Sequence, residues 1–385
     1  MTATHHGEQS VWQALVAARG DEVRRAGRWR RPRPFDASGP AGVMTDDGRK
    51  VVSFASNDYL GLSAHPAVAE AAAQAIARWG TGAGASRLVT GSRPVHHQLE
   101  AELAAHAGCE RAVLFPTGFA ANLGVLTSFG ERGVLVCSDE YNHASIVDGA
   151  RLCRAEVAVY PHRDLEALEK LVAGAGGPVL VVSDLVFSMD GDIAPVEELA
   201  ALCRRHGALL VLDEAHAVLG PDPAPHLCGM DALRVGTLSK TLGALGGYVA
   251  GPASFVELVE NRARSYIFTT ALTPADAAAA LAALCLLHTP EGEARLQRLR
   301  AHVQRIAPGH PSPIVPVILG DEASALAASD ALLERGLWVP AIRPPTVPPG
   351  TARLRVTLSA AHCDDDVEHL ARALAGLAES TSWPD

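Results

Sequence analysis

The sequence predicts an α/β protein in which a mostly parallel sheet covered by helices is followed by a smaller α+β domain. From about residue 46 to 285, short runs rich in β-branched residues alternate with helical patterns. These runs are apolar throughout, which is typical of strands buried on both faces of a parallel sheet. After about residue 290 the pattern changes to a few strands and helices around a proline-rich loop.

The individual elements follow from these patterns. A continuous apolar run predicts a strand, and apolar residues three or four apart predict a helix. The mostly alanine stretch 271–288 predicts a buried helix, and Asp-Asp-Gly before Lys50 predicts a hairpin turn. The expected strands are 112–115, 134–139, 156–160, 179–184, 208–213, 233–238, 314–320 and 353–359, and the expected helices are 94–108, 143–152, 164–174, 195–207, 322–335 and a final C-terminal helix.

We expect three regions, an N-terminal arm (1–45), a large domain (46–288) and a small C-terminal domain (289–385). The arm begins with an amphipathic stretch at 11–23 and continues into residues 24–34, which hold six arginines. These arginines form either an anion site or a solvated arm, and for most of them the solvated arm is favoured.

Composition excludes several classes of function. A net charge of −10 argues against broad binding to nucleic acid or anionic membranes. Seven cysteines without a C-x-x-C pair favour a reducing compartment, and the first residues hold no apolar signal segment. We therefore expect a cytoplasmic protein. No zinc motif is present, so no metal is expected, and the missing dinucleotide and P-loop fingerprints weaken NAD(P) and nucleotide functions.

Lysine occurs only at Lys50, Lys170 and Lys240. Lys50 is expected at a hairpin, and Lys170 follows Glu166 by four residues, as in a solvated ion pair on a helix. Lys240 follows a strand and precedes a glycine-rich segment, which favours a lysine of lowered pKa capable of covalent carbonyl chemistry. A lysine at the sheet edge with its charge in solvent remains the alternative.

Two further features favour pyridoxal 5′-phosphate (PLP) as the cofactor. Asp213 ends a strand and His216 follows it, so an acid for the pyridine nitrogen and a second polar group share one crevice. A helix N-cap is the alternative role of Asp213. Gly118 and Phe119 open a helix after a strand, where backbone N–H groups can hold a phosphate.

Ordered motifs along nearly the whole chain resemble the α-oxoamine synthases, a family of fold-type I PLP-dependent transferases. The resemblance rests on SNDYLGLSAHP at 56–66, GAGASRLVTGS at 82–92, HHQLEAELA at 96–104, TGFAANLG at 117–124, NHASIVDG at 142–149, VFSMDGD at 186–192, LDEAH at 212–216, TLSKTLG at 237–243 and RLRVTLSAAH at 353–362.

The resemblance implies a role for each matching residue. Lys240 would bond to PLP, Asp213 would bind its ring nitrogen, and His143 would stack on the ring, although a helix-start cap is the alternative role of His143. His216 and Ser188 would lie near the phenolic oxygen. The remaining expected cofactor residues are Gly118, Phe119, Thr237, Ser239, and, reaching the neighbouring subunit of a homodimer, Thr269 and Thr270. The expected substrate residues, besides His143, are Arg355 and Asn57 at the amino-acid carboxylate and Arg24, Arg343 and Thr346 near the acyl group.

Within this family, segment 341–362 most resembles members that condense L-alanine with a pimeloyl thioester, carried by CoA or acyl-carrier protein, in biotin synthesis. The resemblance implies that Lys240 removes the Cα proton of alanine before acyl transfer and loss of CO₂. One departure is a proline-rich, apparently shortened loop after His216, which puts the acyl preference in doubt. The alternatives are a relative acting on another pair, such as glycine and acetyl-CoA, a non-catalytic scaffold subunit and, more distantly, an NAD-linked oxidoreductase.

Overall fold

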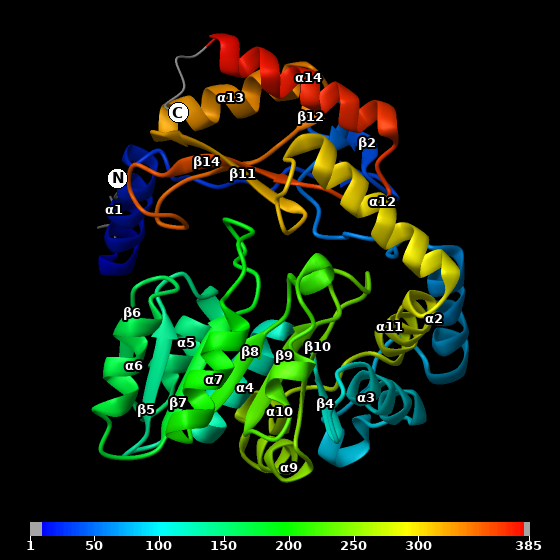
Figure 1. Cartoon of the computed structure of the whole chain (residues 1–385). Helices are drawn as coiled ribbons and strands as arrows, with labels where there is room; N and C mark the ends of the chain where they lie inside the picture. Colours follow the sequence, from blue (N-terminus) through cyan, green and yellow to red (C-terminus); the bar gives the residue numbers. More distant parts are fainter. Residues whose placement is uncertain (1–9, 381–385) are drawn as a thin grey trace, which may run out of the picture.

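A seven-stranded sheet forms the centre of the large unit of the chain, whose computed structural model describes residues 10–380 (Figure 1). All its neighbouring strands are parallel except β10, which pairs antiparallel with both β4 and β9. The strand order is β4 (Arg111–Phe115), β10 (Gly247–Gly251), β9 (Ala232–Thr237), β8 (Leu209–Asp213), β7 (Val179–Asp184), β5 (Leu135–Asp139) and β6 (Glu156–Tyr160).

This sheet confirms the expected fold class and the six strands expected in it. Along β7, Val179 and Val181 belong to one apolar cluster, whereas Leu180 and Val182 belong to another on the opposite face. Because successive side chains of a strand point to opposite faces, a strand covered on both sides must be apolar throughout. The expectation missed β10, whose five residues include two glycines and give little local strand signal.

Helices cover both faces of this sheet. Several helix starts are capped by side chains, as where Thr117 accepts from the backbone N–H of Ala120, and Gly207 ends α7 in the left-handed conformation. The longer helices of this unit are α2 (Pro66–Trp79), α3 (Pro94–His106), α4 (Gly118–Phe129), α5 (Ala144–Leu152), α6 (Leu165–Ala173), α7 (Val196–His206), α9 (Ala253–Arg262) and α11 (Pro274–Leu287). Short helical turns lie at η1 (Arg87–Gly91), η2 (Ala217–Leu219), α8 (Ala224–Leu227) and α10 (Arg264–Ile267).

A smaller unit with two sheets lies over the large one (Figure 1). One sheet has the order β1 (Phe35–Asp36), β2 (Ala41–Met44), β3 (Lys50–Ser53) and β12 (Leu337–Trp338). The other has the order β11 (Ile314–Gly320), β14 (Ala352–Thr357) and β13 (Ala341–Ile342). Its helices are α12 (Pro290–Ile306), α13 (Glu322–Glu334) and α14 (Asp364–Ser380), and α1 (Val11–Arg25) lies at its side.

The hairpin expected before Lys50 is present between β2 and β3, with Gly48 at a φ of +74°. Since β3 pairs with β12, segment 35–53 joins the C-terminal strands in one sheet. The division of the chain at residues 45 and 288 remains a prediction, but the sheets show that the smaller unit draws on both ends of the chain. None of the helices between residues 10 and 380 combines the length and the apolarity needed to span a bilayer.

Candidate active site

Polar residues from several strand ends meet in a cavity of about 220 Å³ at the edge of the large sheet that faces the smaller unit. This is the edge where ligands bind in open α/β sheets, because the loops that follow parallel strands converge there. Eight of the expected residues line the cavity: Gly118, Phe119, His143, Asp213, His216, Thr237, Ser239 and Lys240.

Lys240 follows β9 and presents its side chain to this cavity. Burial lowers the pKa of its ammonium group, while the carboxylates of Asp213 and Asp184 oppose that shift. The two other lysines are different, since Lys50 is exposed on β3 and Lys170 pairs with Glu166 on the surface of α6 at 2.6 Å. Lys240 is therefore the one lysine placed for chemistry inside the molecule.

Asp213 anchors a chain of buried hydrogen bonds. Its Oδ2 accepts from the Asn122 amide at 2.6 Å and its Oδ1 accepts from the Ala215 backbone at 2.9 Å. Asn122 also donates to Ser145, whose hydroxyl lies 2.7 Å from Nδ1 of His143. This series of hydrogen bonds holds the Asp213 carboxylate in place and links it to the His143 side chain.

His143 caps α5, because its Nδ1 accepts from the Ser145 backbone N–H, and its ring also lines the cavity. The two roles that were alternatives in the sequence are thus compatible in the structure. Desolvation lowers the pKa of the His143 ring, Asp213 opposes the shift and Lys240 adds to it. A second carboxyl, Asp184, accepts from the His143 backbone N–H at 2.9 Å, and burial beside Asp213 raises its pKa well above the usual range.

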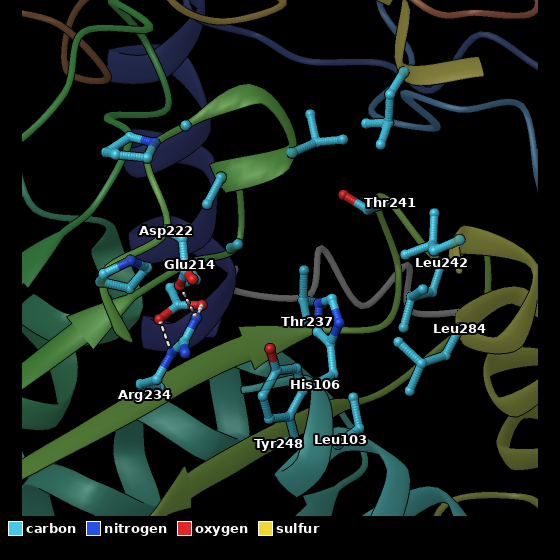
Figure 2. A pocket seen from close by; sticks show the side chains of 18 of the residues that line it. Leu103, His106, Glu214, Asp222, Arg234, Thr237, Thr241, Leu242, Tyr248 and Leu284 are labelled. Carbon is cyan, nitrogen blue, oxygen red and sulfur yellow. Dashed lines mark hydrogen bonds and ion pairs between the residues drawn. The ribbon is translucent and has the colours of Figure 1, made fainter. Parts of the chain in front are cut away.

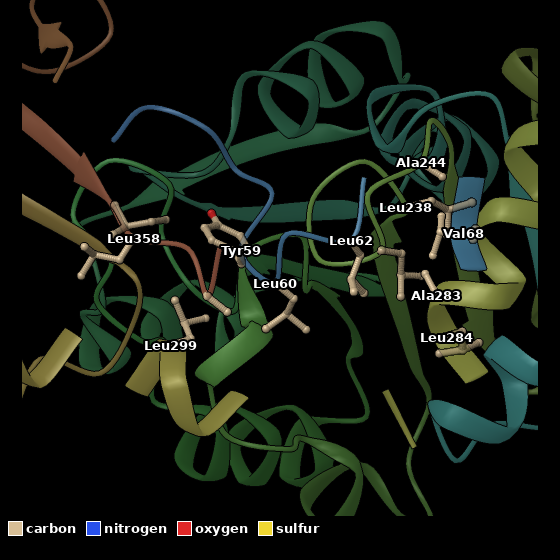
Figure 3. Packing of buried hydrophobic residues seen from close by; sticks show 14 of the residues in the cluster. Tyr59, Leu60, Leu62, Val68, Leu238, Ala244, Ala283, Leu284, Leu299 and Leu358 are labelled. Atoms are coloured by element: carbon tan, nitrogen blue, oxygen red, sulfur yellow. The ribbon is translucent and has the colours of Figure 1, made fainter. Parts of the chain in front are cut away.

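His216 lines the cavity and is held from behind by Tyr59. Its Nδ1 is 2.5 Å from the Tyr59 hydroxyl, which leaves Nε2 available to a ligand. Tyr59 is itself fully buried in an apolar cluster with Leu60 and Leu358 (Figure 3). Burial lowers the pKa of His216 well below its usual value, with Lys240, Arg355 and His143 adding to the effect, so the ring is neutral near pH 7.

The start of α4 forms a cradle with the end of β9. A Cβ added to Gly118 would lie 3.2 Å from the Cβ of Thr237, so a larger residue would crowd this point. The Thr237 hydroxyl lies 2.7 Å from that of Ser239. Two hydroxyls and the N–H groups that open a helix are donors suited to a phosphate.

Arg355 of β14 is a buried cation that reaches this region from the smaller unit. Its Nε donates to the Ser188 carbonyl at 2.6 Å, and its Nη atoms donate to Thr357 at 2.8 Å and to Asn57 at 3.2 Å and 3.3 Å. Within residues 10–380 no carboxylate pairs with it, whereas Arg353 on the same strand pairs with Asp190. A buried guanidinium surrounded by neutral acceptors favours binding of an anionic ligand.

Five expected residues lie elsewhere in the single chain. Arg24 is on the exposed helix α1, where its guanidinium stacks 4.2 Å from the Trp29 ring and pairs with Asp21. Arg343 donates to the Gly27 carbonyl at 3.0 Å, and Thr346 lies exposed in the turn after it. The remaining two, Thr269 and Thr270, follow α10 and do not line the Lys240 cavity.

Comparison with known proteins assigns the chain to a family. The model of the family described as aminotransferase class I and II matches residues 49–374. The chain belongs to the class I and II aminotransferase family. It is 47% identical over 353 residues to an 8-amino-7-oxononanoate synthase from Burkholderia mallei, an alignment that covers 86% of this chain and 90% of that one.

Two solved structures share this architecture. A serine palmitoyltransferase from S. paucimobilis, solved with PLP and myriocin, is 30% identical, with a TM-score of 0.88 over 97% of this chain and 99% of that one. An 8-amino-7-oxononanoate synthase from Francisella tularensis is 26% identical, with a TM-score of 0.71 over 86% of this chain and 97% of that one.

Several residues of this aminotransferase-family site were not expected from the sequence. Asn122, Ser145 and Asp184 line the cavity, and the Tyr59 hydroxyl forms a hydrogen bond with Nδ1 of His216. Asn122 lies within the motif at 117–124, but its contact with Asp213 joins residues 91 positions apart. No local pattern signals such a pair.

A second cavity of about 410 Å³, the one drawn in Figure 2, shares Ala215 and Thr237 with the first. One wall holds the buried pair of Arg234 and Glu214, whose closest contact is 2.5 Å, and the opposite wall is made of leucines. The loop after His216 forms its rim. Between residues 10 and 380 no group of three or more histidine, cysteine or acidic side chains is arranged to hold a metal ion.

Proposed function

We propose that the chain condenses L-alanine with a pimeloyl thioester, with loss of CO₂, to form 8-amino-7-oxononanoate in biotin biosynthesis. The observation that carries this proposal is that Lys240 and Asp213 share one cavity, near enough to the buried Arg355 that, besides burial, its charge lowers the pKa of Lys240, in a chain 47% identical to synthases of that name. The enzyme is then a PLP-dependent acyltransferase.

The residues of the cavity fit PLP. Lys240 would hold the cofactor covalently, and Asp213, fixed by Asn122, would keep its ring nitrogen protonated. His143 would lie against the ring, His216 would donate to its phenolic oxygen through Nε2, and the cradle of Gly118, Phe119, Thr237 and Ser239 would hold the phosphate. When bound, PLP withdraws electrons from the Cα of an attached amino acid.

The protein groups then have distinct tasks. Arg355, oriented by Asn57 and the Ser188 carbonyl, would bind the alanine carboxylate through its guanidinium. Because burial lowers the pKa of Lys240, its amine is more readily neutral and can accept the Cα proton of alanine. Arg24, Arg343 and Thr346 remain proposed contacts of the acyl group, and in the single chain they lie outside the Lys240 cavity.

We propose a homodimer in which Thr269 and Thr270 of one subunit reach the phosphate of the other. Thr270 is exposed, and Phe268, two positions before it, is 70% exposed, so this segment is accessible to a partner subunit. We also propose a cytoplasmic location, which the free state of all seven cysteines supports.

The test is mass analysis of the product formed from alanine and a panel of acyl thioesters, followed by steady-state rates. The expected outcome is 8-amino-7-oxononanoate, with pimeloyl-CoA or pimeloyl-acyl-carrier protein preferred over acetyl-CoA. A higher kcat/KM with glycine and acetyl-CoA would assign the chain to the other substrate pair. A preparation that binds no PLP on reconstitution would favour a scaffold subunit.

A further inference from the structure

A cluster of charged residues lies outside the cavity, where the loops after β5 and β6 meet. The imidazole of His162 bridges two carboxylates, with Nδ1 at 2.9 Å from Asp139 and Nε2 at 2.8 Å from Asp192. Both ring nitrogens can donate only when the ring is protonated. The geometry therefore suits an imidazolium held between two carboxylates.

The surroundings of His162 hold it in this position. The Tyr141 ring stacks on it at 4.4 Å, and the Phe187 ring meets it edge-on at 4.3 Å. The next residue, Arg163, has a φ of +59°, and among residues 10–380 it is the one non-glycine residue with a positive φ. Its backbone N–H donates to Asp139 at 2.9 Å, so this costly conformation is maintained by the cluster itself.

The cluster connects to the amino-acid site through one hairpin, residues 186–193. Val186 and Ile193 form a β-bridge at its base, and the Phe187 N–H donates to the Asp192 carbonyl at 3.0 Å. The hairpin rises from the large sheet toward β14, as the green loop in Figure 1 shows. There the Ser188 carbonyl accepts from Arg355 and the Asp190 carboxylate pairs with Arg353.

We propose that His162 is a positioning residue for the amino-acid substrate. Clamped between Asp139 and Asp192, its imidazolium fixes hairpin 186–193, and the hairpin in turn orients the Arg355 guanidinium through the Ser188 carbonyl. This inference rests on the proposed function, since it assumes that Arg355 binds the substrate carboxylate. It adds a residue that lies outside the cavity and touches neither cofactor nor substrate.

The charges around His162 favour its protonated form. Asp139 and Asp192 face its two nitrogens, Glu140 accepts from its backbone N–H, and Arg163 pairs with Asp192 at 3.2 Å. Burial opposes protonation, but the hydrogen bonds to Asp139 and Asp192 outweigh it and raise the pKa of His162 to about 9. At neutral pH, His162 is thus protonated and bonded to both carboxylates.

The experiment compares the holoenzymes of wild type, His162→Gln and Asp192→Asn. Alanine is titrated against the absorption of the bound cofactor without thioester, KM is measured for both substrates, and hydrogen exchange is followed in peptides covering 186–193. We expect His162→Gln to raise the alanine Kd about tenfold, with little change in the thioester KM and faster exchange in the hairpin. Asp192→Asn, which retains an acceptor for the imidazole, should show a smaller rise.

His206→Gln is the matched control, because this histidine also contacts a carboxylate, Glu169 at 3.3 Å, and lies at the C-terminal end of α7, the opposite end of that helix from hairpin 186–193. It should leave all three readouts unchanged. The proposal is overturned if His162→Gln leaves the alanine Kd and the exchange unchanged, or if it raises both substrate KM values equally. If wild type makes no product from alanine, the proposed function fails. Hydrogen exchange in peptides covering 186–193 then still tests whether His162 fixes the hairpin.

Discussion

Lys240 is the residue on which the proposed chemistry depends most directly. It is the only lysine in the cavity, and its pKa is lowered by burial. An amine in that position has two tasks, to hold the cofactor and to move the Cα proton, and no neighbouring residue offers a second amine.

Lys240→Ala should therefore lower kcat by roughly 10⁴-fold or more and remove the visible absorption of covalently bound cofactor. Product formation by mass spectrometry and an absorption spectrum check both effects. Lys170→Ala, which changes an exposed lysine of α6, should leave rate and spectrum as in wild type. A Lys240→Ala protein that retained near-normal turnover would contradict the assignment.

The raised pKa of His162 predicts that the stability of the folded protein depends on pH. Its pKa is about 9 in the folded protein, where the Asp139 and Asp192 bonds outweigh burial, and 6.5 is its ordinary value. Because the folded-state pKa is raised, the clamp stabilises the fold fully below about pH 6.5 and loses this effect as the pH rises through about 9.

The free energy of unfolding of wild type should thus exceed that of His162→Gln by about 2 kcal/mol at pH 6, allowing for solvent screening. The part of this difference that comes from the imidazolium charge should vanish as the pH rises through about 9, whereas the part from ring packing against Tyr141 and Phe187 should stay constant. Urea unfolding of both proteins between pH 6 and pH 10 measures it. A difference that stays constant over this range would show that the imidazolium is not the stabilising form.

Among the elements, β10 shows how packing shapes the phosphate cradle. This strand lies between β4 and β9, and Gly247 at its start approaches the first residue of α4. A Cβ added at Gly247 would lie 2.5 Å from the backbone nitrogen of Gly118, closer than real Cβ atoms come. The donors that would hold the phosphate thus depend on a glycine in a neighbouring strand.

Gly247→Ala should destabilise the fold by about 2 kcal/mol and raise the PLP dissociation constant about tenfold or more, because β10 and α4 must separate. Chemical denaturation of the apoprotein and cofactor titration measure the two effects. Gly176→Ala is the control, since an added Cβ there meets nothing within 4 Å. Unchanged cofactor affinity in Gly247→Ala would mean that the start of α4 does not hold the phosphate.

At the scale of the whole molecule, the smaller unit combines both ends of the chain and brings Arg355 to the large unit. One apolar cluster runs through both units, from Leu62 and Leu238 to Leu299 and Leu358. The proposed dimer would complete the site in the same manner, by adding residues that are distant in the sequence.

Mixing two inactive variants tests the shared site. If Lys240 and the pair Thr269 and Thr270 serve one site from different subunits, a hybrid of Lys240→Ala and Thr269→Ala/Thr270→Ala subunits has one intact site. Equal mixing after subunit exchange should restore about a quarter of wild-type activity, since half of the dimers are hybrids with one site each. Activity that never exceeds the mean of the two parents would exclude sharing.

The sequence by itself determined the elements and the principal residues of chemistry. Local apolar patterns were sufficient for the strands from β4 to β9, because burial on both faces leaves a signal within a few residues. Lys240 and Asp213 could be selected in the same way, since Asp213 ends one buried strand, Lys240 follows another, and strand ends meet at one edge of the sheet.

Only the tertiary structure decided which distant residues support them. Tyr59 meets His216 across 157 positions, Arg355 meets Ser188 across 167, and β10 inserts between β4 and β9. His162 contacts two carboxylates from separate parts of the chain, Asp139 at the end of β5 and Asp192 in hairpin 186–193. Such contacts arise when packing closes long loops, and because no local propensity encodes the partner, the sequence alone cannot specify them.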